Sequence, residues 1–159
     1  MSRFPLVRYQ VEKDLPEYLQ PGEARQLIDA AAGNRHGARD QLFLDLLLQT
    51  GIRISEGLRI TPGDLTWLNR QPVLWIRRGK GGKTRQVSLP ARIAAELLEY
   101  QRQHQLGTGD RFFPITRQRA WQIIKAAAGS AGISKNSYPH LFRLLQVEDA
   151  LKIAEGVEI

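Results

Sequence analysis

The chain contains an apolar run, Gln41-Leu42-Phe43-Leu44-Asp45-Leu46-Leu47-Leu48, followed after Gln49 by Thr50-Gly51-Ile52-Arg53-Ile54-Ser55-Glu56. Leucine or phenylalanine falls on nearly every side of the first part, which predicts a helix buried all round. Gly51 is a residue suited to end that helix. Charged side chains at the edge of a core are normally paired or used, so Arg53 and Glu56 need an explanation. Taken alone, they are typical of an i,i+3 ion pair at a helix start.

Helical and strand periodicities continue on both sides of this run. Helical spacing predicts helices over residues 21–33, 40–49, 54–59, 90–106, 116–129 and 139–155. In the stripe of the fourth helix we expect Ile93, Ala94, Leu97 and Leu98. Alternating and β-branched residues predict strands over 66–68, 73–77 and 84–89, with turns at 69–72 and 79–83. The predicted fold class is α+β, mainly α: helices with one small three-stranded antiparallel sheet. Residues 1–20 form a lead-in segment, and 21–159 form one domain.

Composition excludes several classes of site. The 159 residues are 42% hydrophobic and 25% charged, which is typical of a globular protein. Cysteine is absent, so disulfides, thiolate metal sites and thiol nucleophiles are excluded. The three histidines are scattered, and we expect no metal. The sequence shows neither a signal peptide nor an apolar run that could span a bilayer, so no membrane partner and a cytoplasmic location are expected.

Positive charge is concentrated in two blocks that lack acidic residues. The formal net charge is +7. Residues 65–95 hold seven basic residues and residues 111–147 hold six, with no Asp or Glu in either block. A solvated basic surface is the plain interpretation, but the concentration favours nucleic acid as a partner. The residues expected to contact DNA are Arg77, Arg78, Lys80, Arg85, Arg117 and Arg119.

Gly82-Lys83-Thr84 copies the end of a nucleotide-binding phosphate loop. The first glycine of that motif would fall at position 77, where Arg77 stands, and a strand follows instead of a helix. We therefore reject a nucleotide site. What remains is a glycine-rich hairpin tip that carries Lys80 and Lys83; a solvated turn is its alternative interpretation.

His140 and Arg143 fall at i and i+3, on one face of the last predicted helix. Considered alone, they are a polar face near a helix start. Together with Arg53 and Lys83 they fit phosphodiester chemistry. Two guanidinium groups can bind the non-bridging oxygens, a lysine can protonate a leaving oxygen, and a histidine can transfer a proton.

Three motifs, in this order and at these separations, resemble the catalytic domain of the tyrosine recombinase (phage integrase) family: residues Thr50 to Leu58, Gly79-Lys80-Gly81-Gly82-Lys83, and His140-Leu141-Phe142-Arg143. The resemblance covers about residues 20–159, so that 21–159 would be an integrase-like catalytic domain. It implies that Arg53 and Arg143 bind the scissile phosphate, that Lys83 is the general acid, that His140 assists proton transfer and that Glu56 is a supporting residue. It also implies double-stranded DNA as the substrate, recombinase protomers as partners in a synaptic assembly, a 3′-phosphotyrosyl intermediate, and no cofactor.

The chain departs from the family pattern at its C-terminal end. The nucleophilic tyrosine of the family, and its second histidine or tryptophan, fall beyond Ile159, and Leu144 stands where the family commonly has histidine. None of the four tyrosines (Tyr9, Tyr18, Tyr100 and Tyr138) is placed as a substitute. Two hypotheses stay open: a C-terminally incomplete catalytic domain that does not cleave DNA by itself, and a non-catalytic DNA-binding module derived from an integrase. Whether this chain is itself an enzyme is therefore uncertain from the sequence.

Overall fold

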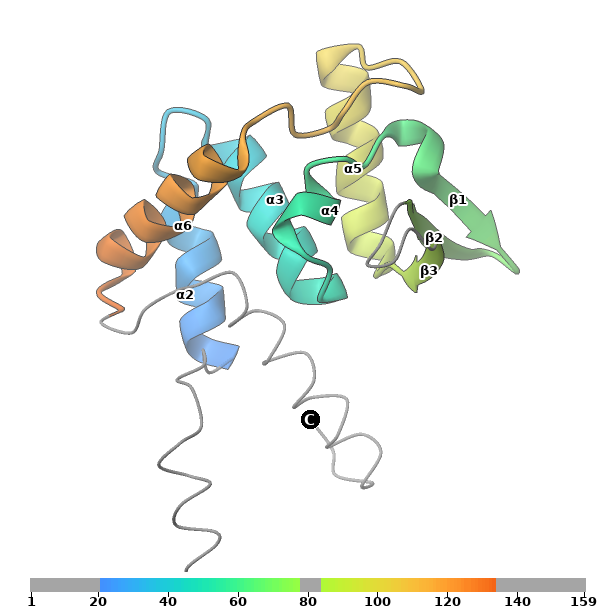
Figure 1. The fold of residues 1–159 in the computed structure, drawn as a ribbon. Coiled ribbons are helices and arrows are strands. Elements are labelled where there is room, and N and C mark those ends of the chain that lie inside the picture. The colour runs from blue at the N-terminus through green and yellow to red at the C-terminus, as the bar shows by residue number, and fades with distance from the viewer. Residues whose placement is uncertain (1–20, 78–83, 134–159) are drawn as a thin grey trace, which may run out of the picture.

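The computed structural model describes residues 21–77 and 84–133 (Figure 1). The elements follow in the order α2 (Pro21–Ala31), α3 (Gly37–Thr50), α4 (Ile54–Gly57), the 3-10 helix η1 (Pro62–Asp64), β1 (Leu65–Leu68), β2 (Gln71–Ile76), β3 (Arg85–Ser88), α5 (Ala91–His104) and α6 (Arg117–Ala131). Helices with one three-stranded antiparallel sheet confirm the expected fold class. The lead-in segment, the hairpin tip and the helix expected over 139–155 lie outside the described residues.

Helix α3 is the centre of the core. Residues Leu42 to Leu48 are all buried, and the side chains of Phe43, Leu44 and Leu46 have no exposed surface. The helix has neighbours on several sides because α2, α4 and α5 all pack against it. This arrangement explains why leucine occurs all round the helix. Its start lies about three residues earlier than the sequence predicted, at Gly37.

The sheet is a meander in the order β1-β2-β3. Leu74 of β2 faces Leu65 of β1 and Val87 of β3. The first turn is shorter than predicted, since Gln71 and Pro72 belong to β2. Its two central residues, Asn69 and Arg70, have φ of 50° and 66°, which is the left-handed backbone that a two-residue hairpin requires.

Helices α5 and α6 cover opposite sides of the core. On α6, Thr116 caps the helix by accepting a hydrogen bond from the Arg119 N–H at 3.0 Å, and the apolar residues Ala120, Ile123, Ile124 and Ala127 are buried. On α5, Ile93, Ala94 and Leu97 are buried as expected, but Leu98 is 42% exposed, so its placement in the core stripe was wrong. Leu98 is one position, about 100° of helix rotation, past the buried Leu97, which turns it away from the core.

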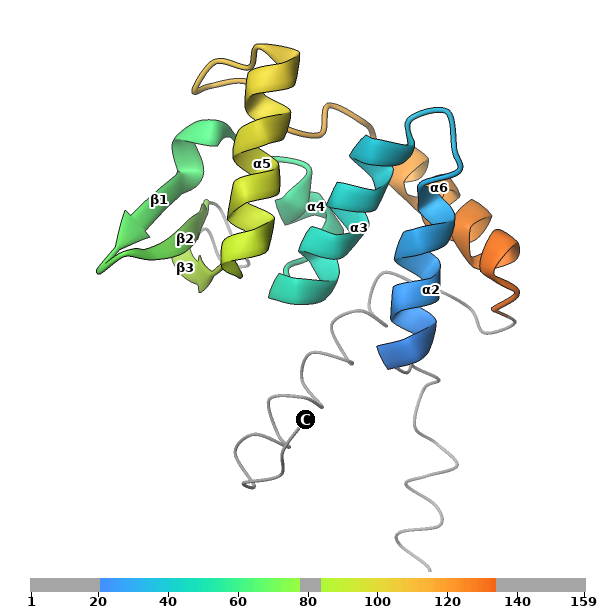
Figure 2. The same cartoon turned by 180° about the vertical axis from the view of Figure 1, so that it is seen from behind.

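The helices form two faces of the molecule. Helices α4 and α6 lie toward the viewer in Figure 1, and α2, α3 and α5 lie toward the viewer in Figure 2. The two faces are joined because α6 packs against α2 and α4. No helix within the described part of the chain combines the length and the apolarity needed to cross a membrane.

Gly57 allows α4 to lie directly on α3. A Cβ atom at this position would be 3.2 Å from Leu47 Cδ2 and 3.2 Å from Phe43 Cε1. We expect Gly57→Leu to lower the free energy of unfolding by about 1–3 kcal/mol, because the added side chain overpacks this contact. Urea unfolding followed by circular dichroism measures the change.

Gly129 provides the matched control for this substitution. It lies on α6, and no atom is within 4 Å of the position that a Cβ would take. Gly129→Leu should therefore leave stability unchanged or raise it by about 0.5 kcal/mol through helix propensity. Equal unfolding midpoints for the two variants would contradict the close packing of α4 on α3.

Candidate functional site

The turn between α3 and α4 determines where Arg53 is placed. The Thr50 hydroxyl donates a hydrogen bond to the Leu46 carbonyl at 2.7 Å. Gly51 adopts a left-handed conformation with φ of 69°, and its N–H donates to the Leu47 carbonyl at 2.9 Å. These bonds satisfy backbone groups that the end of α3 would otherwise leave open, as a C-terminal glycine commonly does. The expected role of Gly51 as the end of the helix is confirmed.

Arg53 lies between two buried residues. Ile52 and Ile54 are 2% and 5% exposed, so both sides of this short segment are anchored in the core. Arg53 itself is in extended backbone with φ of −73° and ψ of 152°, and it precedes the first residue of α4. Its side chain is half-buried, and within residues 21–77 and 84–133 its guanidinium makes no hydrogen bond or ion pair at contact distance. A fixed backbone therefore presents a guanidinium whose donors the described residues leave unused.

Glu56 contacts Arg53 through the backbone, not through a side-chain ion pair. Glu56 Oε1 accepts the Arg53 N–H at 2.8 Å, which is the capping contact of a carboxylate at the N-terminus of a helix. The ion pair of Glu56 is with Arg85 on β3: Nη1 donates to Oε2 at 2.6 Å and Nη2 to Oε1 at 3.0 Å. The structure thus corrects the expected i,i+3 pair, since Arg85 is the charged partner.

The carboxylate of Glu56 is only 4% exposed and stays ionised. Burial by itself would raise the pKa of Glu56. The hydrogen bonds from Arg85 and from the Arg53 N–H, together with the positive charges of both arginines, outweigh burial and lower the pKa below its usual 4.5. The same hydrogen bond raises the pKa of Arg85.

A second carboxylate, that of Asp64, holds Arg77 in the same manner. Arg77 Nε donates to Asp64 Oδ1 at 2.5 Å, and Asp64 is 5% exposed. The other oxygen, Oδ2, accepts from the Thr61 N–H and the Thr61 hydroxyl, both at 3.1 Å. Arg77 and Arg85, which the sequence assigned to DNA contact, therefore both hold buried acids.

A cavity of about 260 Å³ lies beside α4, between these two ion pairs. Arg59 lines this cavity, is exposed and has no ion-pair partner among the described residues. Arg59 was not among the residues that the sequence predicted to contact DNA. The lining residues are Glu56, Arg59, Ile60, Thr61, Asp64, Trp75 and Arg77.

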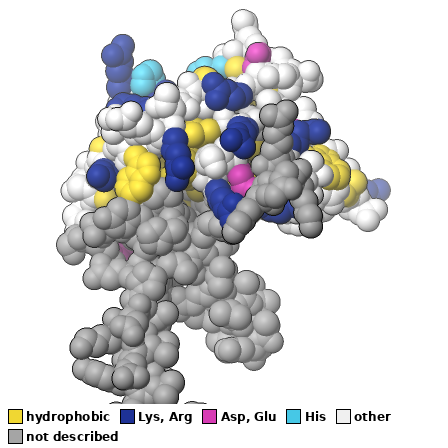
Figure 3. All heavy atoms as spheres, in the orientation of Figure 1, with side chains coloured by type: hydrophobic (Ala, Val, Ile, Leu, Met, Phe, Trp, Pro, Cys, Tyr) yellow, Lys and Arg dark blue, Asp and Glu magenta, His cyan; other side chains and the backbone are white. Residues whose placement is uncertain are grey.

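The described cations fall into a paired and an unpaired group. Six arginines have an acid within ion-pair distance: Arg25, Arg39, Arg77, Arg85, Arg92 and Arg102. Six other cations have no acid within ion-pair distance among the described residues: Arg53 and Arg59, which flank α4, Arg117, Arg119 and Lys125 on α6, and Arg111 in the loop before α6. Figure 3 shows that Lys and Arg cover much more of this face than Asp and Glu do. Arg35 and Arg70, in two loops, also lack an acidic partner within the described ranges.

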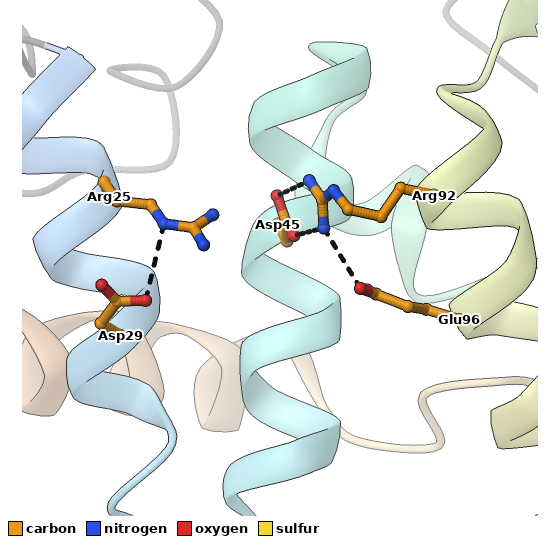
Figure 4. A network of polar contacts seen from close by, with 5 residues as sticks. All are labelled: Arg25, Asp29, Asp45, Arg92 and Glu96. Atoms are coloured by element: carbon orange, nitrogen blue, oxygen red, sulfur yellow. Dashed lines mark hydrogen bonds and ion pairs between the residues drawn. The ribbon is translucent and has the colours of Figure 1, made fainter.

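On the opposite face, several described cations are paired with acids. Arg92 of α5 donates to both oxygens of the buried Asp45 on α3, at 2.6 and 3.3 Å, and to Glu96 at 3.2 Å (Figure 4). On α2, Arg25 lies 3.7 Å from Asp29. The acid-free block of residues 65–95 is therefore not a continuous free basic surface, because three of its arginines bind acids from other parts of the chain.

The structure places only part of the predicted constellation. Arg53 and Glu56 are described and adjacent, and Arg117 and Arg119 begin α6, which packs against α4. The predicted residues Arg78, Lys80, Lys83, His140 and Arg143 lie outside the described residues. Within the described ranges no group of three or more His, Asp or Glu could hold a metal ion.

Tyr100 is the tyrosine that the described residues contain. It lies on α5, half-buried, with its ring 4.1 Å from that of His104 and 6.1 Å from that of Phe113. Burial raises the pKa of Tyr100, whereas a nucleophile is activated by a lowered pKa or by an adjacent base. This environment is that of a packing residue.

Comparisons with known proteins give one consistent result. The family described as "Phage integrase family" matches residues 17–146. The tyrosine recombinase XerD of Corynebacterium glutamicum is 30% identical over 145 residues, which cover 82% of this chain and 47% of that protein. The chain thus spans about half the length of such relatives.

Solved structures with the same fold are also recombinases. The XerA recombinase superposes with a TM-score of 0.71 at 25% identity, covering 88% of this chain and 51% of that one. The XerH site-specific recombinase, bound to palindromic difH substrate in a post-cleavage complex, gives a TM-score of 0.70 at 23% identity. That match covers 91% of this chain and 47% of XerH.

The ion pair of Glu56 predicts a pH-dependent contribution to stability. Because the pKa of Glu56 is lowered on folding, its contribution is present above the usual 4.5 and is lost as pH falls through the lowered pKa. At pH 7, Glu56→Gln should lower the free energy of unfolding by about 1–2 kcal/mol. This loss is smaller than that expected for a fully buried ion pair, because the side chain of Arg85 is partly exposed to solvent. Urea unfolding between about pH 7 and 3.5 should show this gap closing on the acidic side.

Glu96→Gln is the control for that series. Glu96 also pairs with an arginine, but its side chain is 46% exposed, so its loss should cost less than about 0.5 kcal/mol. A gap for Glu56→Gln that stays constant with pH would show that the carboxylate charge makes no contribution.

Proposed function

Because the chain belongs to the phage integrase family, we propose that it binds double-stranded DNA and forms the phosphate-binding part of a tyrosine recombinase site. The observation that carries this proposal is Arg53. Two buried isoleucines and the Glu56 cap fix its backbone, while its guanidinium has no partner at contact distance within the described residues. A preorganised planar cation of this kind suits the non-bridging oxygens of a phosphodiester.

The unpaired cations support duplex DNA as the ligand. Those next to α4 and on α6 share one side of the molecule, and a surface of this kind attracts a polyanion by releasing its counterions. XerH, a site-specific recombinase with the same fold, was solved bound to palindromic difH substrate. Among the residues predicted to contact DNA, Arg117 and Arg119 have no acidic partner in the described part of the chain, and we add Arg59 to them.

The proposed chemistry is transfer of a phosphoryl group to tyrosine. The tyrosine oxygen attacks phosphorus, a Tyr O–P bond forms, and the P–O5′ bond breaks. Arg53 and Arg143 neutralise the charge that develops on the non-bridging oxygens. Lys83 gives a proton to the departing 5′ oxygen, and His140 assists proton transfer by taking the proton that the tyrosine O–H loses on attack. The reaction needs neither a metal nor a nucleotide, because the phosphotyrosyl bond retains the energy of the broken bond.

The tyrosine nucleophile is the part of this site that we do not assign to residues 1–159. The buried environment and raised pKa of Tyr100 speak against it, and the sequence favours none of Tyr9, Tyr18 or Tyr138. We therefore propose that these residues bind DNA without cutting it, and that cleavage requires a tyrosine from outside them. A recombinase protomer in a synaptic assembly is one source. The cytoplasmic location expected from the sequence suits a DNA substrate.

The same reasoning supports a second candidate function, that of a non-catalytic DNA-binding module. The packed position of Tyr100 favours it. The two candidates differ in whether a supplied tyrosine restores cleavage.

Salt dependence tests the binding face. We expect the association constant for duplex DNA to fall steeply between about 50 and 200 mM salt, as measured by fluorescence anisotropy. Arg59→Gln and Arg117→Gln should each reduce the slope of log K against log salt by about 0.9, the value for one phosphate contact. Arg102→Gln is the control, because Arg102 pairs with Glu99 on α5; its slope should be unchanged. A wild-type affinity that is independent of salt would contradict the proposal.

Covalent trapping tests the chemistry. Residues 1–159 mixed with a nicked duplex that traps phosphotyrosyl intermediates should give no covalent protein–DNA band on a denaturing gel. Adding a full-length recombinase whose own Arg53 equivalent is substituted should restore a band only if the present chain supplies a working phosphate site. A covalent band from residues 1–159 alone would show that one of its own tyrosines is the nucleophile.

A further inference from the structure

One carboxylate joins two segments that lie far apart in the sequence. Glu56 Oε1 accepts both the Arg53 N–H at 2.8 Å and Arg85 Nη2 at 3.0 Å. Arg53 is the N-cap residue that precedes α4, whereas Arg85 is the first residue of β3. The same oxygen therefore connects the backbone of the proposed phosphate-binding arginine to the start of a strand 29 residues after Glu56.

The strand β3, which starts at Arg85, follows the connection between β2 and β3 that carries Lys80 and Lys83 in the sequence. Arg85 faces Ile76 of β2, so these two residues form the last pair of the sheet before residues 78–83. On the other strand, Arg77 follows Ile76 and binds Asp64. Both strands are thus tied to the α4–η1 segment at the point where the connection begins and ends. In the sequence, Lys83 is two residues before Arg85.

The donors of Arg85 are already used. Its Nη1 and Nη2 both donate to Glu56, at 2.6 and 3.0 Å, in the bidentate geometry that arginine would otherwise offer to a phosphate. Releasing them would leave the carboxylate of Glu56, which is 4% exposed, without its charged partner. A phosphate contact by Arg85 would therefore compete with a buried ion pair.

We propose that Arg85 is a positioning residue and not a DNA contact: through Glu56 it ties the strand next to Lys83 to the backbone of Arg53. The inference rests on the proposed function, because positioning matters only if Arg53 and Lys83 act on one phosphate. It replaces the sequence-based assignment of Arg85 to DNA binding. It also gives Glu56 its supporting role: the carboxylate keeps two functional segments in register.

Four variants of the full chain test this proposal: Arg85→Gln, Arg85→Lys, Glu56→Gln and the double variant Glu56→Gln/Arg85→Gln. Glu56→Gln is decisive because charge and positioning predict opposite results. If Arg85 contacted DNA, removing the acid would free its donors and strengthen binding. If Arg85 acts through Glu56, Glu56→Gln and Arg85→Gln should each weaken duplex binding by about 3- to 10-fold, roughly one charged contact. The double variant should bind no worse than either single variant.

Amide hydrogen exchange without DNA gives an independent readout. We expect residues 84–88 and 53–58 to exchange at least about 10-fold faster in Glu56→Gln and Arg85→Gln, since both variants lose the Glu56–Arg85 ion pair that joins these segments. Arg85→Lys keeps the charge but loses the bidentate geometry, so it should also speed exchange. This exposed substitution provides the result if Glu56→Gln does not fold. Arg59→Gln, at an arginine without an acidic partner in the described part of the chain, should leave exchange unchanged.

The possible failures are distinguishable. If wild-type protein does not bind DNA, the proposed function fails, while the exchange results still show whether the Glu56–Arg85 ion pair stabilises the two segments that it joins. If binding is intact but Glu56→Gln tightens it, or Arg85→Lys matches the wild type in exchange, the positioning role of Arg85 is overturned.

Discussion

The structure depends on a buried carboxylate that is fully used by its neighbours. Both oxygens of Glu56 accept hydrogen bonds, from the Arg53 backbone and from the two terminal nitrogens of Arg85. An ionised acid at the edge of a core is costly unless it is compensated in this way. The hydrogen bonds that compensate for the burial of this carboxylate form only when α4 and β3 are both in place. The local turn after α3 and the distant sheet are therefore folded as one unit, with Arg53 at their junction.

Asp64 repeats this arrangement one step further along the chain. It caps the short η1 helix through Thr61 and binds Arg77 at the end of β2. Helix α4 and η1 are too short to be stable by themselves. Their carboxylates bind both strands of the hairpin, while Gly57 lets α4 rest on the buried α3. The candidate site is thus built on a rigid base although the helices that form it have only one turn each.

The sequence predicted the local features well and the distant pairings poorly. The buried α3, the glycine that ends it, the meander and the helix that starts near residue 116 follow from periodicity and turn chemistry within a few residues. Leu98 was misplaced because position within a helical stripe does not reveal which neighbour covers it. Arg85 with Glu56, and Arg92 with Asp45, lie 29 and 47 residues apart. No local pattern identifies such partners, so a count of basic residues overstated the free charge of the 65–95 block.

The division of the cations between two faces also affects how the molecule approaches a charged partner. Charges that are neutralised at contact distance contribute little to the field far from the surface, whereas unpaired charges contribute fully. Among the described residues, Arg92 and Arg25 are paired with acids on one face, whereas the cations of α4 and α6 on the other face have no acidic partner. The positive charge of this part of the chain is therefore displaced toward the face that bears Arg53. Near a polyanion the protein then experiences a torque, which turns the face bearing Arg53 toward the partner before contact.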